Sequence, residues 1–146
     1  MGLPMKEYVG ALIRNPDNEI LLQKKTWDYD IWPGLWAVFG GEIEPEDNGD
    51  IFAAFDREVI REETKLKIYD VKLFREVKFE ERDQYKNTLS GTCYFIRGRF
   101  DGDLSKIRLG EGAGFAVFDP KELPIIREQM FPYVYETIDA LYGGLE

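Results

Sequence analysis

Residues 40–66 read GGEIEPEDNGDIFAAFDREVIREETKL, a Gly-Gly turn that leads through a polar loop into a helix. The far end of this helix carries the arginine Arg57 and three carboxylates, Glu58, Glu62 and Glu63. Glu58 and Glu62 stand at i,i+4 spacing, where like charges on a helix repel by about 0.2–0.5 kcal/mol per pair. A bound cation would turn this repulsion into a binding site, so the segment predicts a site for a divalent metal ion.

The polar part of this segment predicts the start of the helix. Turn-forming residues fill 42–50, and Asp50 is placed to cap a helix over about residues 51–64. Within that helix Ile51, Phe55 and Val59 recur four residues apart and form one apolar stripe for the core. The acidic residues lie beside the stripe.

The rest of the chain predicts mostly strands, with a second helix at its end. Residues 8–14 and 20–25 read as a β-hairpin around a turn at 15–19, and further strands are expected at 37–39, 67–80, 88–100 and 114–118. Met130, Val134, Ile138 and Leu141 have helical spacing, and Pro132 restricts where their helix begins. This order predicts an α+β fold in which helices sandwich a mixed sheet, an α/β/α sandwich.

Length and composition limit the classes of protein. With 146 residues, 44% hydrophobic and 14% aromatic, the chain is expected to fold as one globular domain over residues 1–146. It has no histidine and a single cysteine, Cys93, which we expect to be buried. A disulfide framework, a zinc site and a histidine base therefore lack their usual residues.

The charge indicates what the protein binds. A net charge of −9 argues against stable nucleic-acid binding, because that binding depends on clustered lysine and arginine. Small phosphates can still bind through metal ions and a few local cations. No apolar stretch is long enough to span a membrane and the first residues do not resemble a signal peptide, so a cytoplasmic location is expected.

The segment resembles the signature of Nudix hydrolases, G-x5-E-x7-R-E-U-x-E-E-x-G-U, in which U is aliphatic. The matching residues are Gly41, Arg57-Glu58-Val59, Glu62-Glu63 and Leu66, with Asp47 at the first glutamate position. The chain departs from the signature in three places. The stretch from Asp47 to Arg57 is two residues longer, one extra residue precedes Glu62, and Lys65 stands at the glycine position.

The extra residue allows two interpretations of the helix. In a regular helix Glu62 lies about 40° from Glu58 but Glu63 lies about 140° away, so that Glu63 could not share a metal with Glu58. Alternatively the extra residue, Ile60 or Arg61, is absorbed as a π-bulge, which brings Glu63 back toward Glu58.

The resemblance implies hydrolysis of a pyrophosphate bond. The substrate would be a small molecule linked to a nucleoside diphosphate, such as a nucleoside triphosphate, oxidised or not, or a nucleotide sugar. Mg²⁺, with Mn²⁺ as a substitute, would be held by Glu58, Glu62, Glu63 and the backbone of Gly41. This agrees with the preference of Mg²⁺ for oxygen ligands.

The resemblance also implies roles for further residues. Arg57 would orient a glutamate by an ion pair, and Glu111, between two glycines, would act as the catalytic carboxylate, with Glu80 and Glu81 as alternatives. The sequence does not decide whether the protein forms a homodimer.

Nucleotide contacts are predicted from the residues around the second strand. Because side chains alternate along a strand, only one of Lys24 and Lys25 can face the site, and we assign Lys25. Among the aromatic residues Trp27, Tyr29, Trp32 and Trp36, at most two are expected to touch a ligand, and we assign Trp36 to stack on a base. A competing interpretation is a Nudix-like domain that binds nucleotides or a partner without catalysis.

Overall fold

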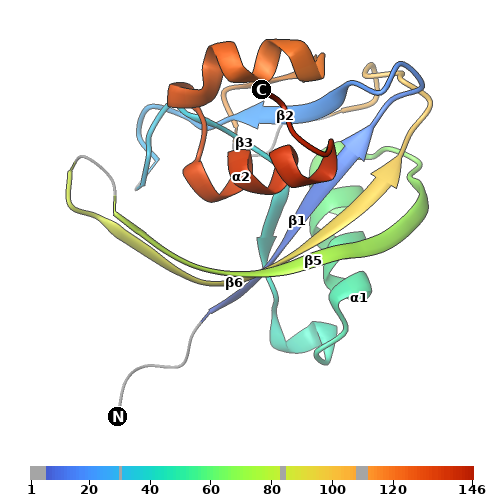
Figure 1. Ribbon diagram of the computed structural model, residues 1–146. Helices are drawn as coiled ribbons and strands as arrows, with labels where there is room; N and C mark the ends of the chain where they lie inside the picture. The colour runs from blue at the N-terminus through green and yellow to red at the C-terminus, as the bar shows by residue number, and fades with distance from the viewer. Residues whose placement is uncertain (1–5, 30, 83–84, 108–111) are drawn as a thin grey trace.

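The computed structural model describes residues 6–29, 31–82, 85–107 and 112–146. It contains a curved mixed sheet with helices on both faces (Figure 1). The strands are β1 (Glu7–Arg14), β2 (Ile20–Lys24), β3 (Trp36–Ala37), β4 (Gly40–Glu42), β5 (Tyr69–Arg82), β6 (Thr88–Arg99) and β7 (Gly114–Phe118). The helices are the 3₁₀-helices η1 (Pro45–Asp47) and η3 (Pro120–Gln129), the α-helices α1 (Ile51–Phe55) and α2 (Pro132–Leu141), and the π-helix η2 (Asp56–Thr64).

The sheet has the strand order β3-β2-β1-β6-β5, with β4 also paired to β1 and β7 to β2. β1 and β6 run parallel, and the remaining pairs are antiparallel. A sheet with both kinds of pairing confirms the predicted α+β class. The long β5–β6 hairpin extends beyond the body of the molecule (Figure 1).

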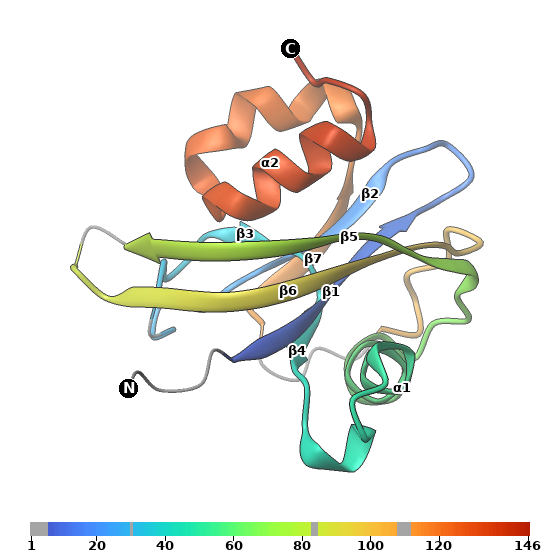
Figure 2. The same ribbon diagram turned by 60° about the horizontal axis from the view of Figure 1, so that its bottom comes forward.

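Two hydrophobic cores lie on the two faces of the sheet. Figure 2 shows α2 on one side of the sheet and α1 on the other. Side chains alternate along β1, so Val9, Ala11 and Ile13 pack with α1 and η2. Leu12 points to the opposite face and packs with α2. Helices η2 and α2 therefore belong to different layers, with β1 between them.

The predicted elements are found close to their expected bounds. The hairpin of β1 and β2 is antiparallel with Arg14 opposite Ile20, and the helix over 51–64 forms with Asp50 as its cap. Pro132 is the first residue of α2, where its missing N–H costs nothing. Helix η3 was not predicted from the sequence. None of the helices in the described ranges is long and apolar enough to cross a membrane.

Candidate active site

Two adjacent glycines of β4 set the position of the acidic helix. A Cβ atom at Gly40 would lie 2.2 Å from the carbonyl oxygen of Val9, so only glycine lets β4 pair closely with β1. A Cβ atom at Gly41 would lie 2.3 Å from Cδ of Glu58. The space that a side chain would occupy at Gly41 is thus filled by the Glu58 carboxylate.

The loop between β4 and α1 absorbs the two residues by which it exceeds the family signature. Asn48 and Gly49 adopt left-handed conformations, with φ of 52° and 75°. These conformations suit asparagine and glycine. Asp50 then accepts hydrogen bonds from the backbone N–H groups of Phe52 and Ala53 and caps the helix. The tight turn keeps Asp47 within reach of Arg57 despite the longer loop.

Arg57 is the centre of the acidic cluster. Its buried guanidinium donates to both carboxylate oxygens of Asp47, with Nε–Oδ1 at 3.0 Å and Nη2–Oδ2 at 2.9 Å, and to the carbonyl oxygen of Glu42 at 3.2 Å. Nη1 donates to Oε2 of Glu58 at 2.8 Å and lies 3.7 Å from Oε2 of Glu62. Such a two-pronged arginine pair fixes orientation as well as charge. Arg57 therefore holds Glu58 at a defined place against Gly41.

The ion pair between Asp47 and Arg57 shifts the pKa values of both side chains. The hydrogen bonds from Arg57, and next the backbone N–H of Glu44, lower the pKa of Asp47 below its ordinary value. The hydrogen bond to Asp47 in turn raises the pKa of Arg57. Both groups stay charged at neutral pH, so a salt bridge joins Asp47 of η1 to Arg57 of η2.

The helix that carries the glutamates has π geometry, so the bulged interpretation is correct and the regular helix is not. The backbone N–H of Lys65 bonds to the carbonyl of Ile60 at 2.8 Å, five residues earlier. Arg61 and Asp56, also five apart, form an ion pair at 3.1 Å. The extra residue is spread over Asp56–Thr64 and not confined to one bulged position.

This geometry decides where the last glutamate lies. Because π-helical hydrogen bonds join residues five apart, Glu63 lies close to one turn after Glu58. Its side chain is partly buried, and its Oε1 atom is fully so. Helix η2 ends at Lys65, which takes the left-handed conformation with φ of 59°. Lys65 thus adopts the backbone form that the family signature provides with glycine.

The donor set of η2 suits a hard cation. Glu58, Glu62 and Glu63 offer only carboxylate oxygens, which Mg²⁺ and Mn²⁺ accept. Among the described residues, no three acidic or cysteine side chains are gathered around one metal position, because Glu58 and Glu62 face Arg57. The Glu62 side chain is 56% exposed and free to reorient. The residues therefore fit a divalent metal that Glu58 would bind while it stays paired with Arg57 and that Glu62 would reach by turning away from Arg57.

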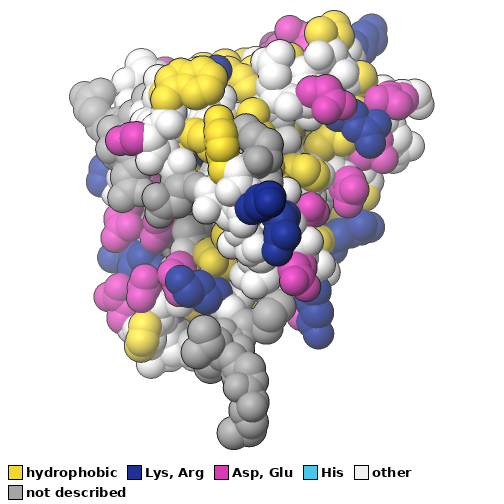
Figure 3. Space-filling view, turned by 90° about the vertical axis from the view of Figure 1, so that its left-hand side faces the viewer, with side chains coloured by type: hydrophobic (Ala, Val, Ile, Leu, Met, Phe, Trp, Pro, Cys, Tyr) yellow, Lys and Arg dark blue, Asp and Glu magenta, His cyan; other side chains and the backbone are white. Residues whose placement is uncertain are grey.

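A cleft adjoins β4. A pocket of about 90 Å³ is lined by Gly40, Gly41, Lys25, Tyr29 and Tyr8 among others. It shares Tyr8, Tyr29 and Leu89 with a wider recess of about 860 Å³ toward the β5–β6 hairpin. On the face in Figure 3, acidic and basic side chains lie beside one another among hydrophobic ones. The net negative charge is therefore not spread uniformly over this face.

Of the two predicted nucleotide contacts, Lys25 and Trp36, the structure places only Lys25 in the cleft. Lys25 lies in the cleft, with Nζ 4.6 Å from the centre of the Tyr29 ring. Trp36 packs edge-on against Phe118, with the two ring centres 4.9 Å apart. The residues that line the 90 Å³ pocket do not include Trp36. Tyr8, which the sequence analysis missed, lines the cleft instead. Its position follows from alternation along β1 only once the pairing with β4 is known.

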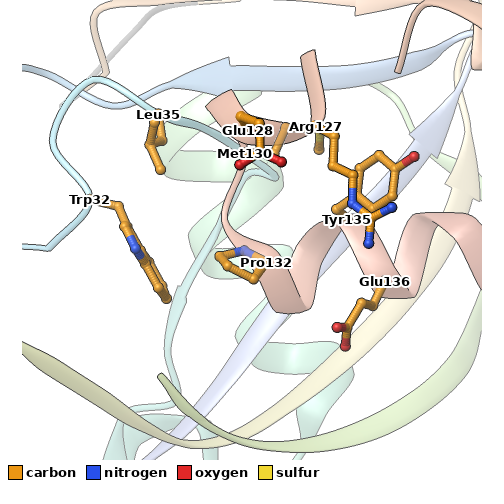
Figure 4. A pocket seen from close by; sticks show the side chains of 8 residues that line it. All are labelled: Trp32, Leu35, Arg127, Glu128, Met130, Pro132, Tyr135 and Glu136. Atoms are coloured by element: carbon orange, nitrogen blue, oxygen red, sulfur yellow. The ribbon is translucent and has the colours of Figure 1, made fainter. Parts of the chain in front are cut away.

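The other tryptophans lie apart from the carboxylates. Trp32 is buried against Phe131 at a centroid distance of 4.8 Å, as expected for a ring at the edge of the core. It borders a separate recess of about 480 Å³ next to η3 and α2, with Tyr135 on the other side (Figure 4). Trp27 is 77% exposed.

Further carboxylates were predicted outside the helix. Glu111 lies outside the described residues. Burial, and next the charge of Glu136 on α2, raise the pKa of Glu81. Glu81 therefore faces the α2 layer, on the other side of the sheet from η2. Cys93 is buried as expected.

Comparisons with known proteins agree with this geometry. A model of the NUDIX domain matches residues 5–140. The chain belongs to the Nudix hydrolase family, in the class of Nudix-type pyrophosphohydrolases. A search of curated protein sequences gave no match.

Solved structures share the fold. A NUDIX hydrolase from Nitrosomonas europaea has a TM-score of 0.72 and 19% identity, over 96% of this chain and 90% of that one. The NUDIX domain of Shewanella oneidensis NrtR complexed with ADP ribose has a TM-score of 0.72 and 14% identity, over 97% of this chain and 89% of that one. A bifunctional NMN adenylyltransferase/ADP ribose pyrophosphatase from Francisella tularensis, complexed with AMP and Mn ion, has a TM-score of 0.73 and 20% identity. The match covers 98% of this chain and 42% of that one. This chain spans less than half of the Francisella protein.

Proposed function

We propose that this protein is a Mg²⁺-dependent hydrolase of the pyrophosphate bond in small molecules linked to a nucleoside diphosphate. The observation that carries the proposal is the buried Arg57, which holds Glu58 against Gly41 and reaches Glu62 on the next turn of η2. Two carboxylates that are held close together in this way offer adjacent oxygen ligands to a divalent metal. Similar proteins named for ADP ribose or bound to AMP support nucleotides as the substrate class.

Glu58, Glu62 and Glu63 would hold the metal, with the backbone of Gly41 beside them. When bound, a divalent cation supplies charge neutralisation of the diphosphate and lowers the pKa of a water molecule. Arg57 keeps Glu58 in place while Glu62 reorients. Because Asp47 binds the other edge of the guanidinium, Arg57 stays fixed when Glu62 leaves it.

The cleft would orient the substrate. Lys25 would neutralise a phosphate oxygen near Gly40 and Gly41, and Tyr29 and Tyr8 would offer aromatic surface to the nucleoside. Water then attacks one phosphorus, the bond from that phosphorus to the bridging oxygen breaks, and a carboxylate takes the proton of the water. We assign that base to Glu111. Nucleoside triphosphates and nucleotide sugars are both compatible with the recess of about 860 Å³.

A product assay over a substrate panel tests this function. Release of phosphate, pyrophosphate or nucleoside monophosphate is measured from nucleoside triphosphates, dinucleoside polyphosphates and nucleotide sugars, with Mg²⁺, with Mn²⁺ and with EDTA. We expect metal-dependent turnover of at least one compound, and a loss of at least 100-fold in Glu62→Gln, as expected when a group that acts on the metal is removed.

The matched control is Asp56→Asn, which removes an exposed carboxylate from the same helix. It should retain activity. Absence of turnover over the whole panel, together with tight nucleotide binding, would favour the non-catalytic binding domain.

A further inference from the structure

Four cations meet at the end of the sheet remote from β4. Arg14 of β1 stands opposite Arg99 of β6, and Lys72 of β5 stands opposite Arg97 of β6. Leu12 and Phe95, which lie on the same faces of their strands as Arg14 and Arg97, pack in the core beneath α2. The cations therefore share the α2 face, on the opposite side of the sheet from the acidic helix.

This arrangement is unfavourable by itself. Like charges directly opposite on neighbouring strands destabilise a sheet. Within the described ranges, the ion pairs closer than 4.0 Å involve Arg57, Arg61 and Arg127, and none involves these four cations. Burial, and next the charge of Arg99, lower the pKa of Arg14. The four cations are therefore not paired within 4.0 Å by any carboxylate of the described residues, and Asp70 is the one acidic residue that lines the pocket with them.

The four side chains line one pocket of about 300 Å³, together with Asp70 and Gly98. Nε of Arg14 is buried and has no hydrogen-bond partner in the described part of the chain. The same guanidinium is held in place, because Nη1 donates to Asn18 at 3.2 Å and the group lies 5.5 Å from the centre of the Tyr142 ring. A buried donor without an acceptor in the chain is usually satisfied from outside it, by water or by a bound ion, and here it opens onto a pocket lined by cations.

We propose that this pocket binds the phosphate or pyrophosphate group of a small molecule, at a site separate from the candidate active site. Arginine presents donors that match phosphate oxygens in pairs, and three arginines and a lysine outweigh the single carboxylate of Asp70 in the pocket. The pocket volume is at the lower end for ligand sites. This size and the net charge of −9 favour a small anion over a nucleic acid. The proposal does not rest on the proposed hydrolase function.

Calorimetric titration in EDTA tests the site without metal at the acidic helix. Inorganic phosphate, pyrophosphate and AMP are titrated at constant ionic strength into the wild type and into the double variant Arg97→Gln/Arg99→Gln. The control double variant Lys67→Gln/Lys78→Gln removes the same charge at two exposed lysines that do not line the pocket. We expect saturable binding, weakened at least tenfold by the arginine changes and less than twofold in the control. Binding of AMP would indicate a phosphate ester as the occupant, and binding of the inorganic anions alone would indicate the free ion.

Thermal unfolding without anion provides a second readout. The arginine double variant should be at least as stable as the wild type, because the cross-strand repulsion is removed. A purely structural role of these arginines predicts a loss of stability instead. The proposal is overturned if none of the three anions binds saturably, if the arginine variant binds as tightly as the wild type, or if the lysine control is weakened equally.

Discussion

Replacing Gly41 by alanine tests the link between the Gly-Gly turn and the acidic helix. The new Cβ atom would lie 2.3 Å from Cδ, 2.4 Å from Oε1 and 2.6 Å from Cγ of Glu58. Ordinary contact begins at 3.4 Å, so the carboxylate has to move by about 1.1 Å. The backbone of Gly41 has no positive φ and can accept alanine, so the side chain of Glu58 moves and the strand does not.

A displacement of 1 Å in a catalytic group can cost about 100-fold in rate. We therefore expect kcat of Gly41→Ala to fall roughly 100-fold, equivalent to about 2.7 kcal/mol of activation free energy. The melting temperature should change little. Steady-state kinetics on the best substrate of the panel measures the effect, and metal titration should show weaker binding.

Gly114→Ala is the matched control. Gly114 is also a strand glycine, and a Cβ atom there would meet no atom of the described residues within 4 Å. Its kcat should equal that of the wild type. A Gly41→Ala variant with kcat within threefold of the wild type, or an equal loss in Gly114→Ala, would refute the reasoning.

Three further changes probe the same segment. Lys65→Gly should stabilise the protein by about 0.5–1 kcal/mol in urea unfolding, because Lys65 occupies a left-handed conformation that favours glycine; an unchanged or lower stability would contradict this. Deletion of Arg61 should convert η2 to a regular helix with the family spacing and keep metal-dependent activity, whereas loss of metal binding in a folded deletion variant would show that the π geometry is required. Asp47→Asn should lower the free energy of unfolding at neutral pH. Since the folded pKa of Asp47 is lowered, its contribution is complete above the unfolded value of about 3.9 and is lost as the pH falls through the folded value, so wild type and variant should converge in acid. A difference that stays constant down to pH 2 would contradict the ion pair.

The sequence predicted the parts of the fold that local patterns determine. Strand-like residue patterns predicted the β1–β2 hairpin and the strands β5 and β6, and the cap at Asp50 predicted the start of the helix. Helix η3 was not predicted, because its 3₁₀ turns and the internal Pro124 produce no 3.6-residue period of apolar residues.

The candidate site could be predicted only in part. Spacing along the chain indicated Arg57 and Glu58, but it was compatible with both a regular and a bulged helix. In the structure the Thr64 hydroxyl donates to the carbonyl oxygen of Val59, five residues earlier, and both residues are buried, which the spacing alone does not show. Tyr8 enters the cleft through the pairing of β1 with β4, and the basic pocket exists because β1 and β6 run parallel in register. Such contacts between distant residues are not encoded in any local pattern.

Binding of Mn²⁺ to the acidic helix is the most direct test of the account. The electron paramagnetic resonance signal of free Mn²⁺ is followed as protein is added, for the wild type, Glu58→Gln, Glu62→Gln and Asp56→Asn. The account predicts that the wild type and Asp56→Asn remove the free signal stoichiometrically and that each glutamine variant of Glu58 and Glu62 binds at least tenfold more weakly. Equal binding by the wild type and Glu58→Gln, or no binding by any of the four proteins, would contradict it.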